Sequence, residues 1–124
     1  MEKGVEISFQ LNGGREDVSV VEALANLTGN FFSSQIEVEW RIFHVTLGEN
    51  LFYKVLYTGK TLNRLHPRNE NDIKRKFDEL AHLDYSELMK EYEVKSREPG
   101  FRKIPVKELK EEYDLWQDKL WNYI

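Results

Sequence analysis

The clearest pattern in the chain lies between residues 35 and 59, where apolar and polar side chains alternate. Residues 36–42 read Ile-Glu-Val-Glu-Trp-Arg-Ile, which has the period of a β-strand with one buried face and one solvated face. A Gly-Glu-Asn turn follows, and residues 51–59 are then rich in aromatic and β-branched side chains. The pattern predicts a long β-hairpin on which the rest of the chain packs.

The alternation changes phase near the end of the first hairpin strand. It runs through Ile42 on even positions, but the next apolar residues, from Phe43 to Leu47, occupy odd positions. A slip of one residue within a strand predicts a β-bulge. The alternative is that both faces of the sheet are covered at this end, which the dense second strand also permits.

The N-terminal pattern predicts another strand and then an ambiguous segment. Val5 to Leu11 alternates apolar with polar residues, and Asn12-Gly13-Gly14 favours a hairpin turn. A returning strand would then run to about Val18. A competing signal begins at Ser19, because Ser19 and Glu22 have the form of a capping box.

Apolar residues follow Ser19 at helical spacing, and Gly29 stands where a helix C-terminal glycine belongs. We expect a short strand to about Val18 and then a helix over residues 19–28, although this segment is compatible with either state. Residues 30–34 would form a connection in which the Phe31-Phe32 pair fills one end of the core.

The C-terminal half has the pattern of helices. Apolar residues at i, i+4, i+7 and i+8 from Ile73 predict a helix after His66-Pro67, and Asp84 or Ser86 restarts a second one. Pro99-Gly100 breaks the pattern, and Pro105 opens a last helix. The fold class is therefore α+β: an antiparallel sheet of roughly three to five strands from the N-terminal half, packed on one face by C-terminal helices.

Length and composition limit the possibilities further. A chain of 124 residues predicts a single domain, residues 1–124, and the absence of cysteine excludes disulfides and thiolate metal sites. No apolar run approaches the ~20 residues of a membrane-spanning helix, and no apolar leader follows Met1. We expect a cytoplasmic protein with no membrane partner.

The residues that usually carry catalysis form no recognisable constellation. His44, His66 and His82 lack the i, i+4 spacing that presents a metal pair on a helix. Glu37 and Glu39 share a strand face, where charged residues are mostly solvated. No phosphate-binding loop or nucleophile elbow is present. We expect no catalytic residue, metal or cofactor; an enzyme with His44 or His66 as base would need a deep pocket there.

Surface aromatic and charged residues favour a binding function. Trp116 and Trp121 are five positions apart, hence about 140° apart around a helix, so a single sheet cannot bury both. Either a second intramolecular neighbour, the helix expected over residues 71–83, or a partner chain would cover the other indole. Trp and Tyr are enriched in binding hot spots. The sequence therefore predicts a non-enzymatic protein-binding or regulatory protein, of which an inhibitor or immunity-type protein is one form. Its partner would be another protein or a second copy in a homodimer. The predicted interface residues are Glu37, Glu39, Arg41, Tyr113, Trp116 and Trp121.

Basic residues supply the alternative interpretation. They gather in residues 60–76 and again in residues 97–103, and the two segments would form one cationic patch if they lie at the same end of the fold. This patch predicts a nucleic-acid or nucleotide-binding protein. Against it stands the net charge of −4, from 18 basic and 22 acidic residues. The candidate residues are Lys60, Arg64, Arg68, Lys74, Arg75, Arg102 and Lys103.

Overall fold

The long β-hairpin that the alternation predicts is the centre of the fold. The structure is a computed structural model and describes residues 4–9, 15–36, 38–47, 50–59 and 67–107. Strand β2 (Val38–Leu47) pairs antiparallel with β3 (Asn50–Gly59) in one unbroken register, from Val38 opposite Gly59 to Leu47 opposite Asn50. The prediction of a β-bulge is therefore wrong.

Two covered faces explain the phase change that suggested the bulge. Ile42 and Phe43 are adjacent in β2, and both are fully buried. Neighbouring residues of a strand point to opposite faces of the sheet. Both faces are therefore covered at this position, so the apolar pattern can change phase while the register stays continuous.

Two further strands complete a sheet with the order β1-β3-β2-β4. Strand β1 (Gly4–Phe9) pairs antiparallel with β3, as the N-terminal alternation predicts. Strand β4 (Val106–Lys107) joins the other edge, parallel to β2. The α+β class with an antiparallel N-terminal sheet is confirmed. The predicted last helix does not begin at Pro105, because the next two residues belong to β4; residues 108–124 lie outside the described residues.

One long helix replaces the predicted strand, short helix and connection of residues 17–34. Helix α1 (Arg15–Ile36) runs through Gly29, and every residue from 23 to 29 is buried. It packs on β2 and β3 with one side and on two further helices, α2 (Pro67–Ala81) and α3 (Tyr85–Ser96), with another. A helix with neighbours on both sides is apolar on more than one face. It therefore lacks the one-sided 3.6-residue period by which an amphipathic helix is recognised in a sequence. The turn predicted at residues 12–14 lies outside the described residues.

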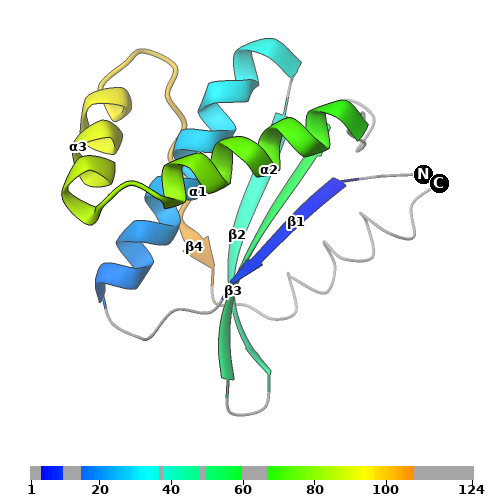
Figure 1. The fold of residues 1–124 in the computed structure, drawn as a ribbon, viewed down its shortest axis with the longest axis vertical. Helices are drawn as coiled ribbons and strands as arrows, with labels where there is room; N and C mark the ends of the chain where they lie inside the picture. Colours follow the sequence, from blue (N-terminus) through cyan, green and yellow to red (C-terminus); the bar gives the residue numbers. More distant parts are fainter. Residues whose placement is uncertain (1–3, 10–14, 37, 48–49, 60–66, 108–124) are drawn as a thin grey trace.

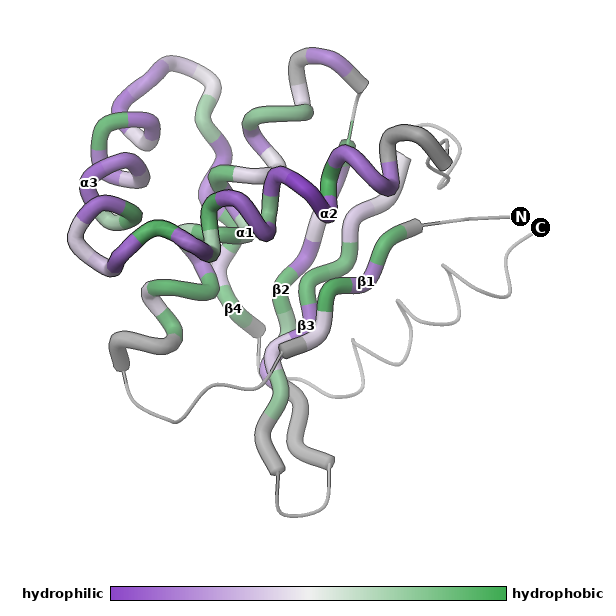
Figure 2. The backbone as a smooth tube through the Cα atoms, in the orientation of Figure 1, coloured by the Kyte–Doolittle hydropathy of each residue, from purple (hydrophilic) through white to green (hydrophobic). Residues whose placement is uncertain are grey.

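Helices α2 and α3 form a second layer over α1, on the same side of the sheet (Figure 1). The predicted stripe of α2 is buried at Ile73, Phe77 and Leu80, while its outer residues are hydrophilic (Figure 2). Asp84 caps α3, accepting a hydrogen bond of 2.8 Å from the backbone N–H of Glu87, as its position predicts. In the described residues, no helix is long and apolar enough to cross a membrane.

Gly29 has a packing role in the middle of α1. A Cβ atom at this position would lie 2.4 Å from ring carbons of Trp40, far inside van der Waals contact. Trp40 is one of the largest fully buried side chains of the core. The glycine that resembles a helix terminus in the sequence therefore provides space for the indole.

We predict that Gly29→Ala destabilises the protein by about 1–3 kcal/mol, because overpacking forces the indole or the helix to move. Helix propensity alone predicts the opposite sign, a gain of about 1 kcal/mol. The urea midpoint measures which effect prevails. In a Trp40→Phe background the smaller ring should remove the penalty. A higher midpoint for Gly29→Ala in the wild-type background would contradict the packing account.

Candidate functional site

Two asparagines of α1 hold a distant segment of the chain against the helix. Asn30 Oδ1 accepts from the backbone N–H of Arg102 at 3.0 Å, and Asn30 Nδ2 donates to the carbonyl oxygen of Arg102 at 2.8 Å. Asn26 makes the same pair of bonds with Ile104, at 2.9 and 3.1 Å. The two asparagines are four residues apart, so they project from the same side of the helix. Together they provide the backbone of residues 102 and 104 with the hydrogen bonds that a neighbouring strand would otherwise provide. We call this pair the asparagine clasp.

Asn26 also accepts a hydrogen bond from the buried indole of Trp40. Trp40 Nε1–H donates to Asn26 Oδ1 at 2.9 Å, and Asn26 Nδ2 reaches the Tyr92 hydroxyl at 3.3 Å. An amide oxygen accepts two hydrogen bonds and an amide nitrogen donates two, so the fully buried Asn26 side chain is satisfied at every position. An Asn within the apolar run Ala-Leu-Ala-Asn-Leu was the sequence signal for this buried polar centre.

Arg102 and Phe101, which adjoin each other in the clasped segment, contact different parts of the fold. The Arg102 guanidinium carbon lies 4.5 Å from the Trp40 ring centre, and Nη2 donates to the carbonyl oxygen of Val38 at 3.0 Å. Phe101 instead lines a cavity of about 130 Å³ between α1, α2 and α3. Arg102, one of the predicted phosphate-binding residues, thus takes part in the packing of the fold.

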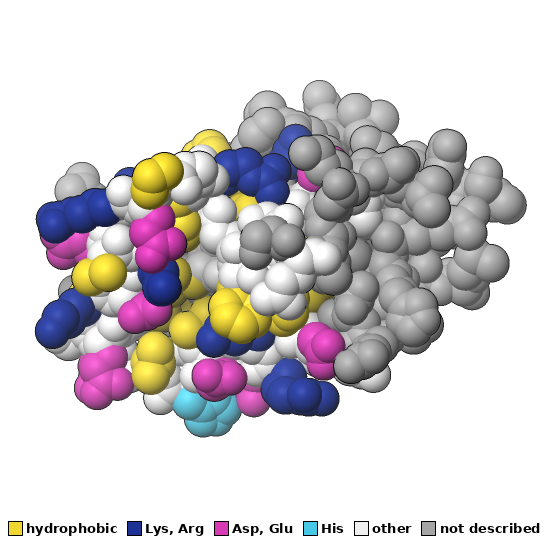
Figure 3. Space-filling view, turned by 90° about the horizontal axis from the view of Figure 1, so that it is seen from above, with side chains coloured by type: hydrophobic (Ala, Val, Ile, Leu, Met, Phe, Trp, Pro, Cys, Tyr) yellow, Lys and Arg dark blue, Asp and Glu magenta, His cyan; other side chains and the backbone are white. Residues whose placement is uncertain are grey.

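A wider open depression adjoins this cavity, and both include Phe31 and Lys76. We define the Phe31 surface as the exposed aromatic residue and the charged residues that line the two hollows. These are Phe31, Asp72, Arg75, Lys76, Glu79, Glu91, Lys95 and Glu98. Seen from above, the described part of the molecule shows charges of both signs mixed with apolar side chains (Figure 3).

Phe31 is held firmly although it is exposed. Its ring packs edge-on against buried Phe32, with centroids 5.0 Å apart, and the Lys76 ammonium lies 4.3 Å from its centre. Phe31 nevertheless remains 48% exposed. The prediction that both phenylalanines fill the core holds for Phe32 and is wrong for Phe31, because adjacent residues on a helix point about 100° apart.

Six of the seven charged residues of the Phe31 surface form pairs with one another. Arg75 lies 3.7 Å from Asp72, Lys76 lies 3.7 Å from Glu79, and Lys95 lies 3.4 Å from Glu98. Exposed ion pairs of this kind contribute little to stability, about 0–1 kcal/mol each. They can therefore be exchanged for the charges of a partner at small cost.

The interface predicted from the sequence is described only in part. Glu39 and Arg41 are half-buried on the sheet face opposite α1, and Arg41 Nη1 donates to the carbonyl oxygen of Trp40 at 2.7 Å. Phe43 and Leu56 on this face are fully buried. Glu37, Tyr113, Trp116 and Trp121 lie outside the described residues.

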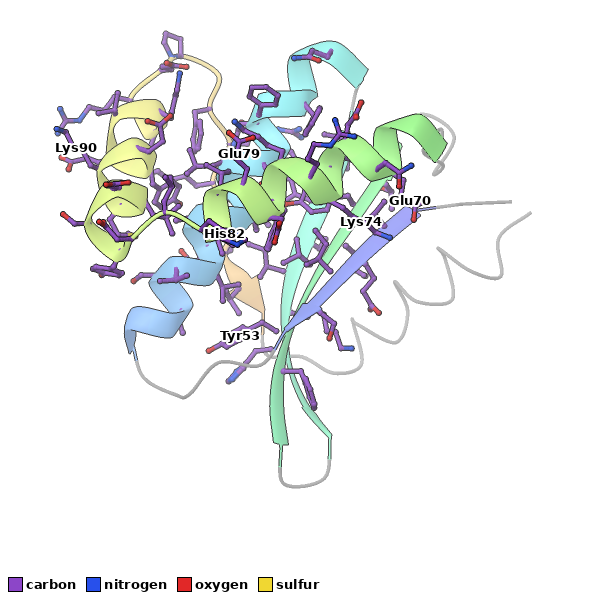
Figure 4. The ribbon with its side chains drawn as sticks, in the orientation of Figure 1. Tyr53, Glu70, Lys74, Glu79, His82 and Lys90 are labelled. Carbon is purple, nitrogen blue, oxygen red and sulfur yellow. The ribbon has the colours of Figure 1, made fainter. Side chains whose placement is uncertain are left out.

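The predicted cationic patch is also only partly described. Lys74 lies 3.1 Å from Glu70 and faces β1, on the side of α2 away from Glu79 (Figure 4). Lys103 Nζ lies 5.9 Å from the Tyr92 ring centre. Arg75 belongs to the Phe31 surface, and the side chain of Arg68 is not among those described. Lys60 and Arg64 lie outside the described residues.

The two histidines among the described residues lie in different elements, His44 in β2 and His82 just after α2. His44 stacks on Tyr53 with ring centres 5.1 Å apart, and His82 is exposed, with Nδ1 2.7 Å from the backbone oxygen of Asp78. Burial raises the pKa of the Tyr57 phenol, and burial likewise raises the pKa of Tyr92 despite its hydrogen bond from Asn26. Within the described ranges, no group of three or more His, Asp or Glu residues could hold a metal ion.

Fold and surface together define a small α+β protein in which three helices lie on the same side of a sheet and present an aromatic residue among charges of both signs. The whole chain, residues 1–124, matches the family described as Protein of unknown function (DUF2004). The chain therefore belongs to the DUF2004 family. A comparison with curated proteins finds no match.

We predict that Asn30→Ala releases one half of the asparagine clasp. Hydrogen exchange of the Arg102 amide should accelerate, because its acceptor is lost, while the Ile104 amide stays protected by Asn26. Stability should fall by about 1 kcal/mol, since a partly buried peptide group loses its partners. Asn71→Ala, at an exposed asparagine of α2, is the control. Equal acceleration at both amides would show that the two asparagines do not act separately.

Proposed function

We propose that this chain is a small non-enzymatic protein-binding or regulatory protein whose described contact site is the Phe31 surface. An inhibitor or immunity-type protein is one concrete form, and the partner is another protein or a second copy of this chain. One observation carries the proposal: a half-exposed phenylalanine, fixed by its packing, is surrounded by charged residues of both signs.

The arrangement has the composition of a protein interface. Aromatic residues are enriched at interface centres, and charged residues lie around them at the rim. Phe31 offers a rigid apolar anchor, since Phe32 and Lys76 fix its ring. The adjoining cavity of about 130 Å³ has room for one side chain of a partner. The alternating charges would select a partner with complementary charges.

The sheet residues Glu37, Glu39 and Arg41 and the C-terminal residues Tyr113, Trp116 and Trp121 remain a proposed second part of the interface. Half-burial of Glu39 and Arg41 leaves each with some surface for a partner. We propose a cytoplasmic location, which a chain without cysteine suits.

We predict that Phe31→Asp abolishes capture of the partner from an extract of the native cell. Loss of an aromatic anchor costs at least about 2 kcal/mol, or roughly thirtyfold in affinity. Tyr85→Asp is the matched control, because Tyr85 on α3 is 49% exposed and Phe31 is 48% exposed. Circular dichroism and thermal unfolding verify that both variants keep the fold. Light scattering of the purified chain detects self-association in the same series.

Photo-crosslinking gives an independent reading of the same contact. A benzophenone amino acid at position 31 should link to the partner, and the same group at position 85 should not. A protein retained equally by both Asp variants, or linked equally from both positions, would mean that the Phe31 surface is not the binding site.

The nucleic-acid alternative makes a separate prediction. If the basic residues contact phosphates, a labelled DNA or RNA oligonucleotide should bind at low salt and dissociate steeply as salt rises, by about 0.9 log units of affinity per log unit of salt for each contact to duplex DNA. Charge reversal at Lys74, as Lys74→Glu, should reduce the slope. A gel shift with no complex at low ionic strength would eliminate this alternative.

A further inference from the structure

A groove distinct from the Phe31 surface lies on the other side of α2, between that helix, α1 and β1. Its volume is about 470 Å³, within the range of ligand sites in proteins. The apolar walls come from Ile7 of β1, Val20 and Leu24 of α1, and Phe77 and Ala81 of α2. Lys74 lies at its margin and faces β1 (Figure 4). An apolar hollow of this size can accept several side chains.

The groove adjoins an edge of the sheet. In the described part of the chain, β1 is the terminal strand and pairs only with β3. An edge strand presents backbone N–H and C=O groups on which another extended segment can add. Side chains alternate between the two faces of a strand. An added strand would therefore direct every second side chain toward the face where Ile7 lines the groove.

The charges at the margin indicate what should accompany the apolar side chains. The Lys74 ammonium is paired with Glu70 at 3.1 Å. Asp78 is 76% exposed, and among the described side chains its partner within ion-pair distance is His82, at 3.8 Å, which is charged only when protonated. A lysine or arginine of an incoming segment would therefore find an available carboxylate at Asp78.

We propose that this groove binds an extended segment of a partner protein by adding it as a strand beside β1. The segment carries apolar residues at alternate positions and, next in the same phase, a lysine or arginine that pairs with Asp78. Main-chain hydrogen bonds to β1 supply affinity and the groove selects the side chains, as in other cases of strand addition. The site is independent of the Phe31 surface, so failure of either proposal leaves the other standing.

The probe is the blocked heptapeptide Thr-Val-Thr-Val-Thr-Lys-Thr, titrated to millimolar concentration into the isotope-labelled full chain and followed by nuclear magnetic resonance. Saturable shifts should appear at amides of β1 and at Ile7, Phe77 and Ala81. The same peptide with Glu in place of Lys should bind on the order of tenfold more weakly. A peptide with all its amides N-methylated should not bind, because it cannot pair with the strand edge.

Matched variants locate the site. Asp78→Lys should weaken the lysine peptide on the order of tenfold and strengthen the glutamate peptide. Glu79→Lys should change neither, although it makes the same charge change one residue away at 68% exposure. Ala81→Phe should fill the groove and block binding, whereas Ser86→Phe on α3 should not. Unfolding curves confirm that each variant is folded.

Three results would overturn the proposal. The first is a lysine peptide that causes no shifts at the groove. The second is an affinity that Ala81→Phe leaves unchanged. The third is an N-methylated peptide that binds as well as the unmodified one, which would exclude addition to the edge of β1.

Discussion

Burial of the Trp40 indole is the interaction on which the rest of the structure depends. The ring needs a flat space, which Gly29 provides, and its N–H needs an acceptor, which Asn26 provides. Arg102 lies against the ring and donates a hydrogen bond to Val38 of the same strand. A buried donor without a partner would cost about 1–3 kcal/mol, so this pairing fixes how α1 lies on the sheet.

The amide that receives the indole also organises a distant part of the chain. Because Asn26 is fully buried, each of its remaining hydrogen-bonding positions must be satisfied, and Ile104 and Tyr92 satisfy them. Asn30 repeats the pattern one turn later with Arg102. The segment after α3 is thereby drawn across α1 toward the sheet, where β4 joins β2. Phe101 reaches the Phe31 surface as a consequence.

Helix α2 separates two surfaces of different character. Its narrow buried stripe packs toward α1, which leaves both flanks of the helix accessible. One flank belongs to the Phe31 surface, where charges of both signs surround an aromatic residue. The other borders an apolar groove beside the edge strand β1. Different residues of one helix thus line the two surfaces for which we propose binding, one through an anchored side chain and the other through an extended backbone.

The sequence by itself determined the elements whose signal is local. Alternation over residues 38–42 specified the first strand of the hairpin, although Ile36, which continues the same alternation, is the last residue of α1. The stripe from Ile73 to Leu80 specified α2, because each pattern has the period of one element with one buried face. The tertiary structure decided the extent of α1, the role of Gly29 and the exposure of Phe31. It also decided the asparagine clasp, in which Asn30 and Arg102 are 72 positions apart and Asn26 and Ile104 are 78 positions apart. These features depend on which distant surfaces meet, and a helix covered on two sides carries no one-sided period from which that meeting could be read.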